Sequence, residues 1–312
     1  MKVASIDIGT NTILMLIAEI AEDGSLAVIS DQQGVARVGK GVDRSGTIEW
    51  DAFTRSERFL SAYLKEARAH AVDLIFCTGT SALRDARNGD DFISYMFQKL
   101  NLEIEILSGS DEALWTYGGA ISGFSERDVK YAVLDIGGGS TELTLGKGFQ
   151  IAKSLSLDIG CVRLTEKILH HAPPTDVEIS SLFSLIDDAV WRYPAFDPAT
   201  TIFVGVAGTV TTLAAVELGL TEYDREQVAG FVLTREMIQG RFEQFRSMTK
   251  DELQNTMRID PGRADIILVG VGILKRMTEL RDIPQIIVSE RGLRYGIVMR
   301  EWERRLERAD IS

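Results

Sequence analysis

The chain has 312 residues, of which 45% are hydrophobic and 26% are charged, a composition typical of a globular protein. Its formal net charge of -12 argues against general nucleic-acid binding, because such binding needs lysines and arginines to neutralise phosphates. The apolar stretch over residues 3–20 is interrupted by Asp7, Asn11 and Glu19, so it resembles neither a signal peptide nor a membrane span. The length predicts about two domains.

The two cysteines, Cys77 and Cys161, lie far apart in the sequence and in different contexts. A reducing cytoplasm is the simplest interpretation of so few thiols, because they form no disulfide framework. We therefore expect a cytoplasmic protein with no nucleic-acid and no membrane partner. Any polyanionic ligand must then enter through a local basic patch or together with a metal ion.

The first part of the chain predicts the element order β-β-β-α-β-α-β-α. The expected strands cover residues 2–8, 13–20, 25–33, 74–78 and 103–107, and the expected helices cover 51–71, 91–100 and 111–121. In the first helix Phe53, Leu60, Leu64 and Ala67 share one face, which is the pattern of a helix packed on a core.

The same order then begins again. The expected strands cover residues 130–136, 141–145, 151–157, 201–206 and 285–288, and the expected helices cover 162–170, 176–191, 209–218, 263–280 and 293–308. Three hairpin-like strands followed by alternating helices and strands thus occur twice, which indicates an internal duplication. The junction at 122–128 is polar and contains Gly123, so we expect a hinge there.

Each half opens with a glycine turn between two strands. The first turn is part of the sequence IDIGTNT, from Ile6, and the second is part of LDIGGGSTE, from Leu134. Glycines allow backbone N–H groups to approach a phosphate, and consecutive N–H groups form an anion-binding nest. One such turn alone could be an ordinary hairpin turn, but two matching ones favour a phosphate clamp.

The side chains of these turns support the same interpretation. Hydroxyl groups at Thr10, Thr12, Ser140 and Thr141 add hydrogen-bond donors. An acidic residue lies at the end of the strand before each turn. This residue is Asp7 in the first half and Asp135 in the second. These carboxylates suit a divalent metal ion, which binds carboxylate and phosphate oxygens together.

A third turn, Ala207-Gly208-Thr209, follows another predicted strand and precedes an apolar helix. The N–H groups at the start of that helix could hold a further anion. A segment that resembles a P-loop, residues 34–40, is rejected because position 41 is Gly instead of the hydroxyl residue that binds magnesium, and no good helix follows.

The sequence resembles the exopolyphosphatase / guanosine pentaphosphate phosphohydrolase family of the actin, hexokinase and Hsp70 superfamily. The resemblance covers nearly the whole chain in order. It rests on the segments SIDIGTNT, TSALRDA, EILSGSDEA, DIGGGSTE, LSLDIGCVRLTE, VGVAGTVTTLAA, PGRADIIL and VSERGLRYGIV. It implies an α/β fold of two duplicated ribonuclease H-like lobes with a cleft between them, over residues 1–124 and 125–299, with residues 300–312 packing back on the first lobe.

The resemblance also implies roles for individual residues. Glu112 matches the general base, and Asp135 is associated with both the catalytic water and the metal. The implied ligands of a Mg²⁺ ion, or of another divalent cation, are Asp7, Asp135 and Glu142. The implied phosphate-binding residues are Thr10, Asn11, Thr12, Arg84, Gly137, Gly138, Gly139, Ser140, Cys161, Gly208, Thr209 and Arg263.

Simpler interpretations of four of these residues stay open on the sequence alone. Glu112 lies at a predicted helix start, where acidic residues favour the helix dipole. Arg84 could be a surface charge, Glu142 could face solvent from its strand, and Cys161 could be a buried thiol. The chain also departs from the family pattern, since Ala207 stands where relatives often have Gly, which puts the contacts of the third turn in doubt.

The implied activity is hydrolysis of a terminal phosphoanhydride bond, in inorganic polyphosphate, in guanosine pentaphosphate, or in both. The chain matches the short form of the family, without the C-terminal HD-like helical region of longer relatives, which suggests shorter chains or nucleotides as substrates. The alternatives are an ATP-dependent sugar or carboxylate kinase of the same superfamily and a non-catalytic actin-like nucleotide-binding protein. The sequence does not decide between a monomer and a homodimer.

Overall fold

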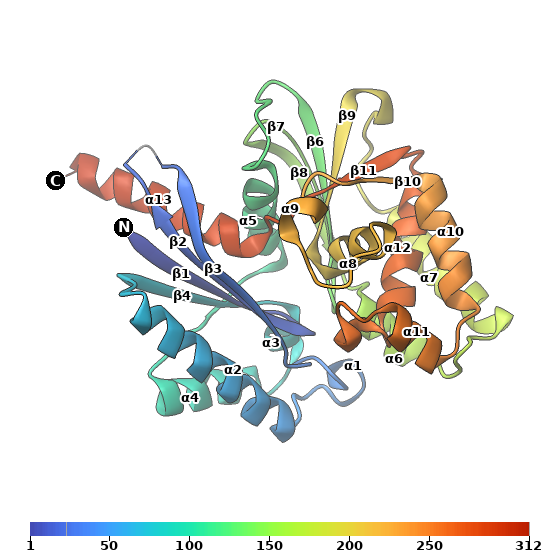
Figure 1. Cartoon of the computed structure of the whole chain (residues 1–312), viewed down its shortest axis with the longest axis horizontal. Coiled ribbons are helices and arrows are strands. Elements are labelled where there is room, and N and C mark those ends of the chain that lie inside the picture. Colours follow the sequence, from blue (N-terminus) through green and yellow to red (C-terminus); the bar gives the residue numbers. More distant parts are fainter. Residues whose placement is uncertain (23, 312) are drawn as a thin grey trace. The chain divides into compact units, whose positions relative to one another are not determined.

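The computed structural model describes the backbone of residues 1–22 and 24–311 and the side chains up to residue 304. The chain forms two compact units, each with its own sheet (Figure 1). Unit 1 contains residues 1–119 together with the C-terminal segment from Arg291, and unit 2 contains Ala120–Glu290. The domain boundaries predicted at 124/125 and 299/300, and the hinge at 122–128, stay predictions.

Unit 1 is built on a five-stranded mixed sheet with the order β3-β2-β1-β4-β5. Its strands are β1 (Lys2–Ile8), β2 (Thr12–Ile20), β3 (Leu26–Val35), β4 (Leu74–Gly79) and β5 (Glu105–Ile106). The first three form an antiparallel meander, and β4 and β5 continue the sheet parallel to β1. The central strand β1 reads as an almost continuous apolar run because helices cover both of its faces.

Helices cover the two faces of this sheet (Figure 1). On one face lie α1 (Val42–Ser45), α2 (Trp50–Ala69), α3 (Ser81–Asp85) and α4 (Gly89–Leu100). On the other face α13 (Leu293–Ile311) packs Tyr295 and Val298 against Val3 and Leu16. The helix α5 (Gly109–Ile121) approaches α13 closely, because a Cβ on Gly296 would lie 1.8 Å from the carbonyl oxygen of Trp115.

Unit 2 repeats the arrangement with one more strand, in the order β10-β11-β9-β6-β7-β8. Its strands are β6 (Lys130–Ile136), β7 (Thr141–Lys147), β8 (Gln150–Leu157), β9 (Thr201–Val206), β10 (Val232–Thr234) and β11 (Gln285–Val288). Again an antiparallel meander, β6-β7-β8, is followed by strands parallel to its first member, β9 and β11, and the additional edge strand β10 is antiparallel to β11. The predicted α/β fold with two duplicated lobes is therefore confirmed.

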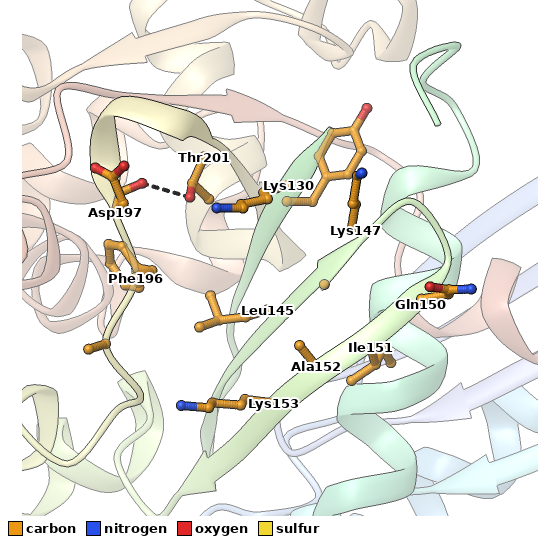
Figure 2. Close-up of a pocket in the computed structure, with 13 residues that line it drawn as sticks. Lys130, Leu145, Lys147, Gln150, Ile151, Ala152, Lys153, Phe196, Asp197 and Thr201 are labelled. Atoms are coloured by element: carbon orange, nitrogen blue, oxygen red, sulfur yellow. Dashed lines mark hydrogen bonds between the residues drawn. The ribbon is translucent and has the colours of Figure 1, made fainter. Parts of the chain in front are cut away.

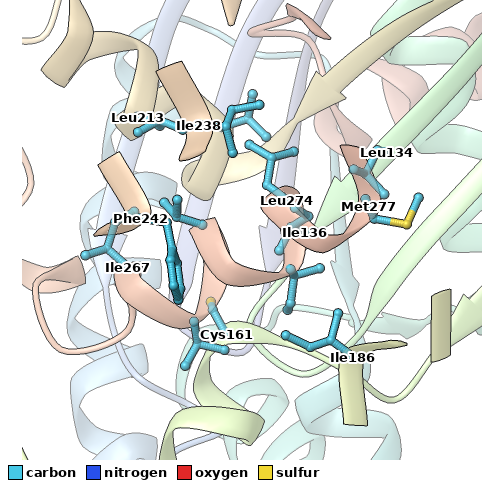
Figure 3. Packing of buried hydrophobic residues seen from close by; sticks show 14 of the residues in the cluster. Leu134, Ile136, Cys161, Ile186, Leu213, Ile238, Phe242, Ile267, Leu274 and Met277 are labelled. Atoms are coloured by element: carbon cyan, nitrogen blue, oxygen red, sulfur yellow. The ribbon is translucent and has the colours of Figure 1, made fainter. Parts of the chain in front are cut away.

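The core of unit 2 lies between this sheet and a layer of helices. The layer contains α6 (Cys161–Ile168), α7 (Asp176–Val190), α8 (Ala207–Glu217), α10 (Arg235–Arg246) and α12 (Ile267–Leu280). Figure 3 shows Leu134 and Ile136 of β6 with Leu274 of α12 and Phe242 of α10, all fully or almost fully buried. The core thus fixes the end of β6 from which the second glycine turn begins.

The structure differs from the sequence prediction mainly between residues 219 and 262. No element was expected there, but α9 (Arg225–Val228), β10, α10 and α11 (Lys250–Thr256) are present. The helix predicted from residue 263 begins at Ile267 instead, because Pro261–Arg263 forms a separate 3-10 turn. None of the described helices is both long and apolar enough to cross a membrane.

The segment that resembles a P-loop has no suitable helix. It begins at the end of β3 and leads into α1, which has four residues. Gly39 of this segment packs against the first glycine turn, where a Cβ would lie 2.2 Å from Cγ2 of Thr10. The segment therefore supports the turn instead of cradling a nucleotide.

Candidate active site

The first glycine turn joins β1 to β2 in unit 1. The amide of Gly9 donates to the carbonyl of Thr12 at 3.0 Å, which closes the turn. The carbonyls of Thr10 and Asn11 accept from the amides of Gly39 and Arg37, both at 2.8 Å. The N–H groups of Thr10 and Asn11 have no acceptor among the described residues, so they are available to an anion.

The side chains of this turn are largely buried and are held by the start of α3. Thr10, Asn11 and Thr12 are each 7% exposed, and the hydroxyls of Thr10 and Ser81 lie 2.8 Å apart. Ser81 is not among the residues predicted from the sequence, although it belongs to the segment TSALRDA. The structure thus brings the first turn together with the helix that carries Arg84.

Arg84 and Glu112 form an ion pair within unit 1. Nη1 of Arg84 donates to Oε2 of Glu112 at 3.1 Å and to the carbonyl of Leu107 at 2.8 Å. Glu112 is 9% exposed, and burial raises the pKa of its carboxyl group, while the charge and hydrogen bond of Arg84 act in the opposite direction. Neither side chain is a surface charge, which was the simpler interpretation of Arg84.

The second glycine turn joins β6 to β7 in unit 2 and faces the start of α6. The amide of Gly137 donates to the carbonyl of Ser140 at 3.0 Å, and the carbonyl of Gly137 accepts from the amide of Cys161 at 2.9 Å. Within the described part of the chain, the N–H groups of Gly138, Gly139 and Ser140 donate to no acceptor. The carbonyl of Ser140 is therefore held within the turn, while these three N–H groups are available to an anion.

Two residues that the sequence analysis did not identify shape this turn. Nε of Arg163 donates to the carbonyl of Gly139 at 2.8 Å. Gly160 lies directly against the turn, since a Cβ at this position would be 2.3 Å from the carbonyl oxygen of Gly138. Both belong to the segment LSLDIGCVRLTE, but only the fold shows that this segment supports the turn.

Asp135 and Glu142 face each other across β6 and β7. Their Cα atoms are register partners, so both side chains lie on the same face of the sheet. Glu142 is 2% exposed and accepts from the hydroxyl of Ser156 at 2.6 Å, so it does not face solvent. Two carboxylates directly opposite each other repel, which a bound cation would relieve.

The third turn lies beside the second. Ala207 has a φ of 67°, in the left-handed region that favours glycine. A Cβ on Gly208 would lie 1.9 Å from Cζ of Arg263, so the guanidinium group packs directly on this glycine. Nε of Arg263 donates to Oδ2 of Asp260 at 2.7 Å, and the hydroxyl of Thr209 donates to the carbonyl of Ile136 at 3.4 Å.

The thiol of Cys161 is buried next to the second and third turns. Burial raises its pKa to about 11, although Arg263 and hydrogen bonds, including one with Thr209, oppose the rise. The thiol is therefore neutral near pH 7 and is not an activated nucleophile. Its backbone amide, which binds Gly137, contributes to the turn instead.

Each half of the predicted site therefore belongs to one unit. Unit 1 brings together Thr10, Asn11 and Thr12 near α3, and it pairs Arg84 with Glu112. Asp7 lies one residue before the end of β1, opposite Leu14 and Thr78. Unit 2 groups the remaining predicted residues around the ends of β6 and β9, namely Asp135, Gly137, Gly138, Gly139, Ser140, Glu142, Cys161, Gly208, Thr209 and Arg263. Their roles toward phosphate and metal stay predictions.

Two duplicated α/β units, each opening with a glycine turn between its first two strands, define the fold of the chain as actin-like. The family model described as the Ppx/GppA phosphatase family matches residues 16–305. The chain belongs to this family and is a phosphatase of the Ppx/GppA type.

Individual relatives agree with this assignment. The chain is 33% identical to a protein named exopolyphosphatase 2 from Mycobacterium tuberculosis, over 96% of this chain and 98% of that protein. It is 30% identical to a guanosine-5'-triphosphate,3'-diphosphate pyrophosphatase from Vibrio parahaemolyticus, over 95% of this chain but 58% of that protein. The crystal structure of the Aquifex aeolicus family member is 32% identical, with a TM-score of 0.81 and 98% coverage of both chains.

Proposed function

We propose that this phosphatase releases the terminal phosphate of inorganic polyphosphate, with Glu112 activating water for a direct attack on phosphorus. The observation that carries the proposal is the pair of matching glycine turns, each of which presents N–H groups with no acceptor among the described residues. Such groups bind the oxygens of a phosphoryl group. Phosphoryl transfer needs mainly alignment and charge stabilisation, which these turns supply.

Glu112 is the group suited to removing a proton from water. Its carboxylate is buried, and burial raises its pKa, so it is a stronger base than an exposed glutamate. Arg84 donates to one of its oxygens, and its positive charge lowers the pKa of the carboxyl group against the effect of burial. A covalent route through Cys161 is disfavoured because the high pKa keeps that thiol neutral.

A divalent cation fits the second turn. Asp135 and Glu142 present hard oxygen donors on one face of the sheet, and their mutual repulsion favours a cation between them. Among the described residues no three His, Cys, Asp or Glu side chains form a metal cluster, so the proposed ion would take its remaining ligands from water and phosphate. When bound, Mg²⁺ would neutralise the phosphate oxygens.

The preference for polyphosphate over guanosine pentaphosphate rests on the relatives. The relative with nearly the same length as this chain is named an exopolyphosphatase. The one named for a guanosine nucleotide is covered over only 58% of its length. Both substrates end in a phosphoanhydride, so guanosine pentaphosphate is the competing substrate to test.

The test measures phosphate release from tripolyphosphate, from longer polyphosphates and from guanosine pentaphosphate, each with and without Mg²⁺. We expect Mg²⁺-dependent release from polyphosphate. Glu112→Gln should slow turnover by about 10²–10⁴-fold, the usual contribution of a general base. The matched control is Asp111→Asn, because Asp111 is the neighbouring carboxylate and is exposed.

Two outcomes would contradict the proposal. Glu112→Gln could hydrolyse polyphosphate at the normal rate, which would remove the role of Glu112. Alternatively, the protein could leave polyphosphate intact and transfer phosphate from ATP to a sugar or to acetate, which would favour the kinase alternative.

A further inference from the structure

A cavity lies in unit 2, at the end of the sheet opposite the glycine turn. It has a volume of about 400 Å³ and is lined by the first residues of β6, the last residues of β7, the first residues of β8 and the segment 195–201 (Figure 2). Lys130 and Asp135 are five residues apart on β6, which corresponds to roughly 17 Å along a strand. The cavity is therefore separate from the proposed phosphate site.

The cavity gathers positive charge in a chain whose net charge is -12. Lys130 and Lys147 are direct register partners across β6 and β7, and Lys153 lies on the adjacent strand β8. Like charges placed opposite each other in a sheet repel. An anion close to the lysines would relieve this repulsion.

The local carboxylates do not neutralise these lysines. Lys147 pairs with Asp128 at 2.5 Å, but Lys130 and Lys153 form no ion pair with any described residue. Asp197 lines the cavity, but its two oxygens accept from the amide of Ala199 and the hydroxyl of Thr200, at 3.1 and 2.9 Å. Two ammonium groups are therefore left for a ligand.

An apolar surface lies between these two lysines. Leu145 is the register partner of Lys153, and Figure 2 shows Lys130, Leu145 and Lys153 extending from their strands toward the segment that carries Phe196. The ring of Phe196 is held in place, edge-to-face against Phe203 with centroids 5.0 Å apart. A ligand that fills this space needs an apolar part as well as negative charge.

The wall that carries Phe196 is held at its start by Arg281. Arg281 donates to the carbonyls of Val190 and Tyr193, both at 3.1 Å, and to the carbonyl of Pro194 at 2.7 Å. Its guanidinium group also lies 4.7 Å from the centroid of the Phe196 ring. One arginine thus anchors the chain just before Phe196 and packs on its ring. A preformed pocket is typical of small-molecule sites.

We propose that this cavity binds a phosphorylated nucleoside. Its phosphates would contact Lys130 and Lys153, with Lys147 adding to the positive potential, and its base would pack on Leu145 and Phe196. The volume lies within the range of roughly 300–1,000 Å³ that small-molecule sites occupy. Inorganic phosphate or polyphosphate would use the lysines but leave the apolar wall exposed, so neither matches the cavity as well.

The test is calorimetric titration of the full chain with GDP, with pyrophosphate and with guanosine. GDP should bind at least about tenfold more tightly than either of its parts, because only GDP uses both the charge and the apolar wall. The double variant Lys130→Gln/Lys153→Gln should weaken GDP binding by at least about tenfold, as the loss of charge-assisted contacts predicts. Lys250→Gln removes an exposed lysine elsewhere in unit 2 and should leave GDP binding unchanged.

A second variant tests the location without touching the lysines. Ala195 is exposed and lines the cavity, so Ala195→Asp should fold normally and repel the phosphates. Phosphate release from polyphosphate should be unchanged in all of these variants. Equal affinity for pyrophosphate and GDP would overturn the nucleoside assignment. The site itself would be overturned if GDP did not bind, or if neither Ala195→Asp nor the double lysine variant changed the affinity for GDP.

Discussion

Gly160 shows how a single atom can determine the shape of the second turn. Any Cβ at this position would lie 2.3 Å from the carbonyl oxygen of Gly138, so the backbone of the turn would have to shift. We expect Gly160→Ala to destabilise the protein by about 1–3 kcal/mol, the usual cost of overpacking. Phosphate release should fall as well, because the displaced turn no longer presents its N–H groups.

Urea unfolding and steady-state kinetics measure these two effects. Gly240→Ala is the matched control, because Gly240 is exposed within α10 and a Cβ there meets nothing within 4 Å. This control should be neutral or stabilising by up to about 1 kcal/mol, since alanine favours helices more than glycine does. A Gly160→Ala protein with normal stability and turnover would show that the turn tolerates displacement.

Gly208 controls the position of Arg263. A Cβ at Gly208 would overlap the guanidinium group, which is the end of a flexible side chain, so the arginine would move while the backbone stays. If Arg263 binds phosphate, Gly208→Ala should lower kcat/KM for polyphosphate about as much as Arg263→Met does, with little change in the unfolding midpoint. A large effect of Arg263→Met combined with no effect of Gly208→Ala would mean that the position of Arg263 in the structure is not the active one.

At the scale of elements, α3 and α5 together set the proton affinity of Glu112. Burial raises the pKa of Glu112, and Arg84 lowers it. The base is active only when ionised, so kcat/KM should fall at acidic pH, with a midpoint above the value of about 4.3 for an exposed glutamate. Arg84→Met removes the lowering charge, so this midpoint should shift to higher pH.

The pH dependence of kcat/KM for polyphosphate measures that shift. The midpoint, not the height of the profile, is the readout, because loss of Arg84 could also weaken phosphate binding. Arg87→Met provides the control, since Arg87 is exposed two residues beyond α3 and contacts the carbonyl of Ser45. A midpoint that shifts to lower pH, or that shifts equally in Arg87→Met, would contradict the assignment of Glu112 as the base.

The elements differ in how well the sequence predicts them. The meanders β1-β2-β3 and β6-β7-β8 are predictable because long apolar strands alternate with short polar turns. The three-residue strand β10 is not predictable from the sequence. It is defined by its pairing with β11, and its residues show no local strand pattern. The helix α10 could have been found, since Ile238, Phe242 and Phe245 recur on one face and Thr234 caps its start.

The residues of the candidate site also differ in how well the sequence predicts them. Residues within the turns, such as Thr10 and Gly138, carry their own chemical signal in the sequence. Residues that support a turn from elsewhere in the chain, such as Ser81 and Gly160, become identifiable only when the fold places them beside it. The ion pair between Arg84 and Glu112 spans 28 residues, and neither local pattern indicates it.

At the scale of the whole molecule, the duplication gives each unit its own sheet, core and glycine turn. A ligand that binds one unit should therefore stabilise that unit first. The opposed carboxylates of Asp135 and Glu142 lie in unit 2, so Mg²⁺ should protect unit 2 by relieving their repulsion.

Magnesium removal tests this directly. Ligand binding to the folded state adds about 2.7 kcal/mol of stability at a concentration of 100 Kd, so Mg²⁺ should raise the melting temperature and slow hydrogen exchange in β6 and β7. Chelation with EDTA should reverse both effects and stop phosphate release. Glu142→Gln should lose the response to Mg²⁺, yet melt higher than the unsubstituted protein without metal, because one of the two opposed charges is gone.

The control for this experiment is Glu103→Gln, which removes an exposed carboxylate in unit 1 and should keep the full response to Mg²⁺. Protection by Mg²⁺ that persists in Glu142→Gln would place the cation elsewhere. Protection confined to the strands of unit 1 would also place the cation elsewhere, because both carboxylates of the proposed pair lie on β6 and β7.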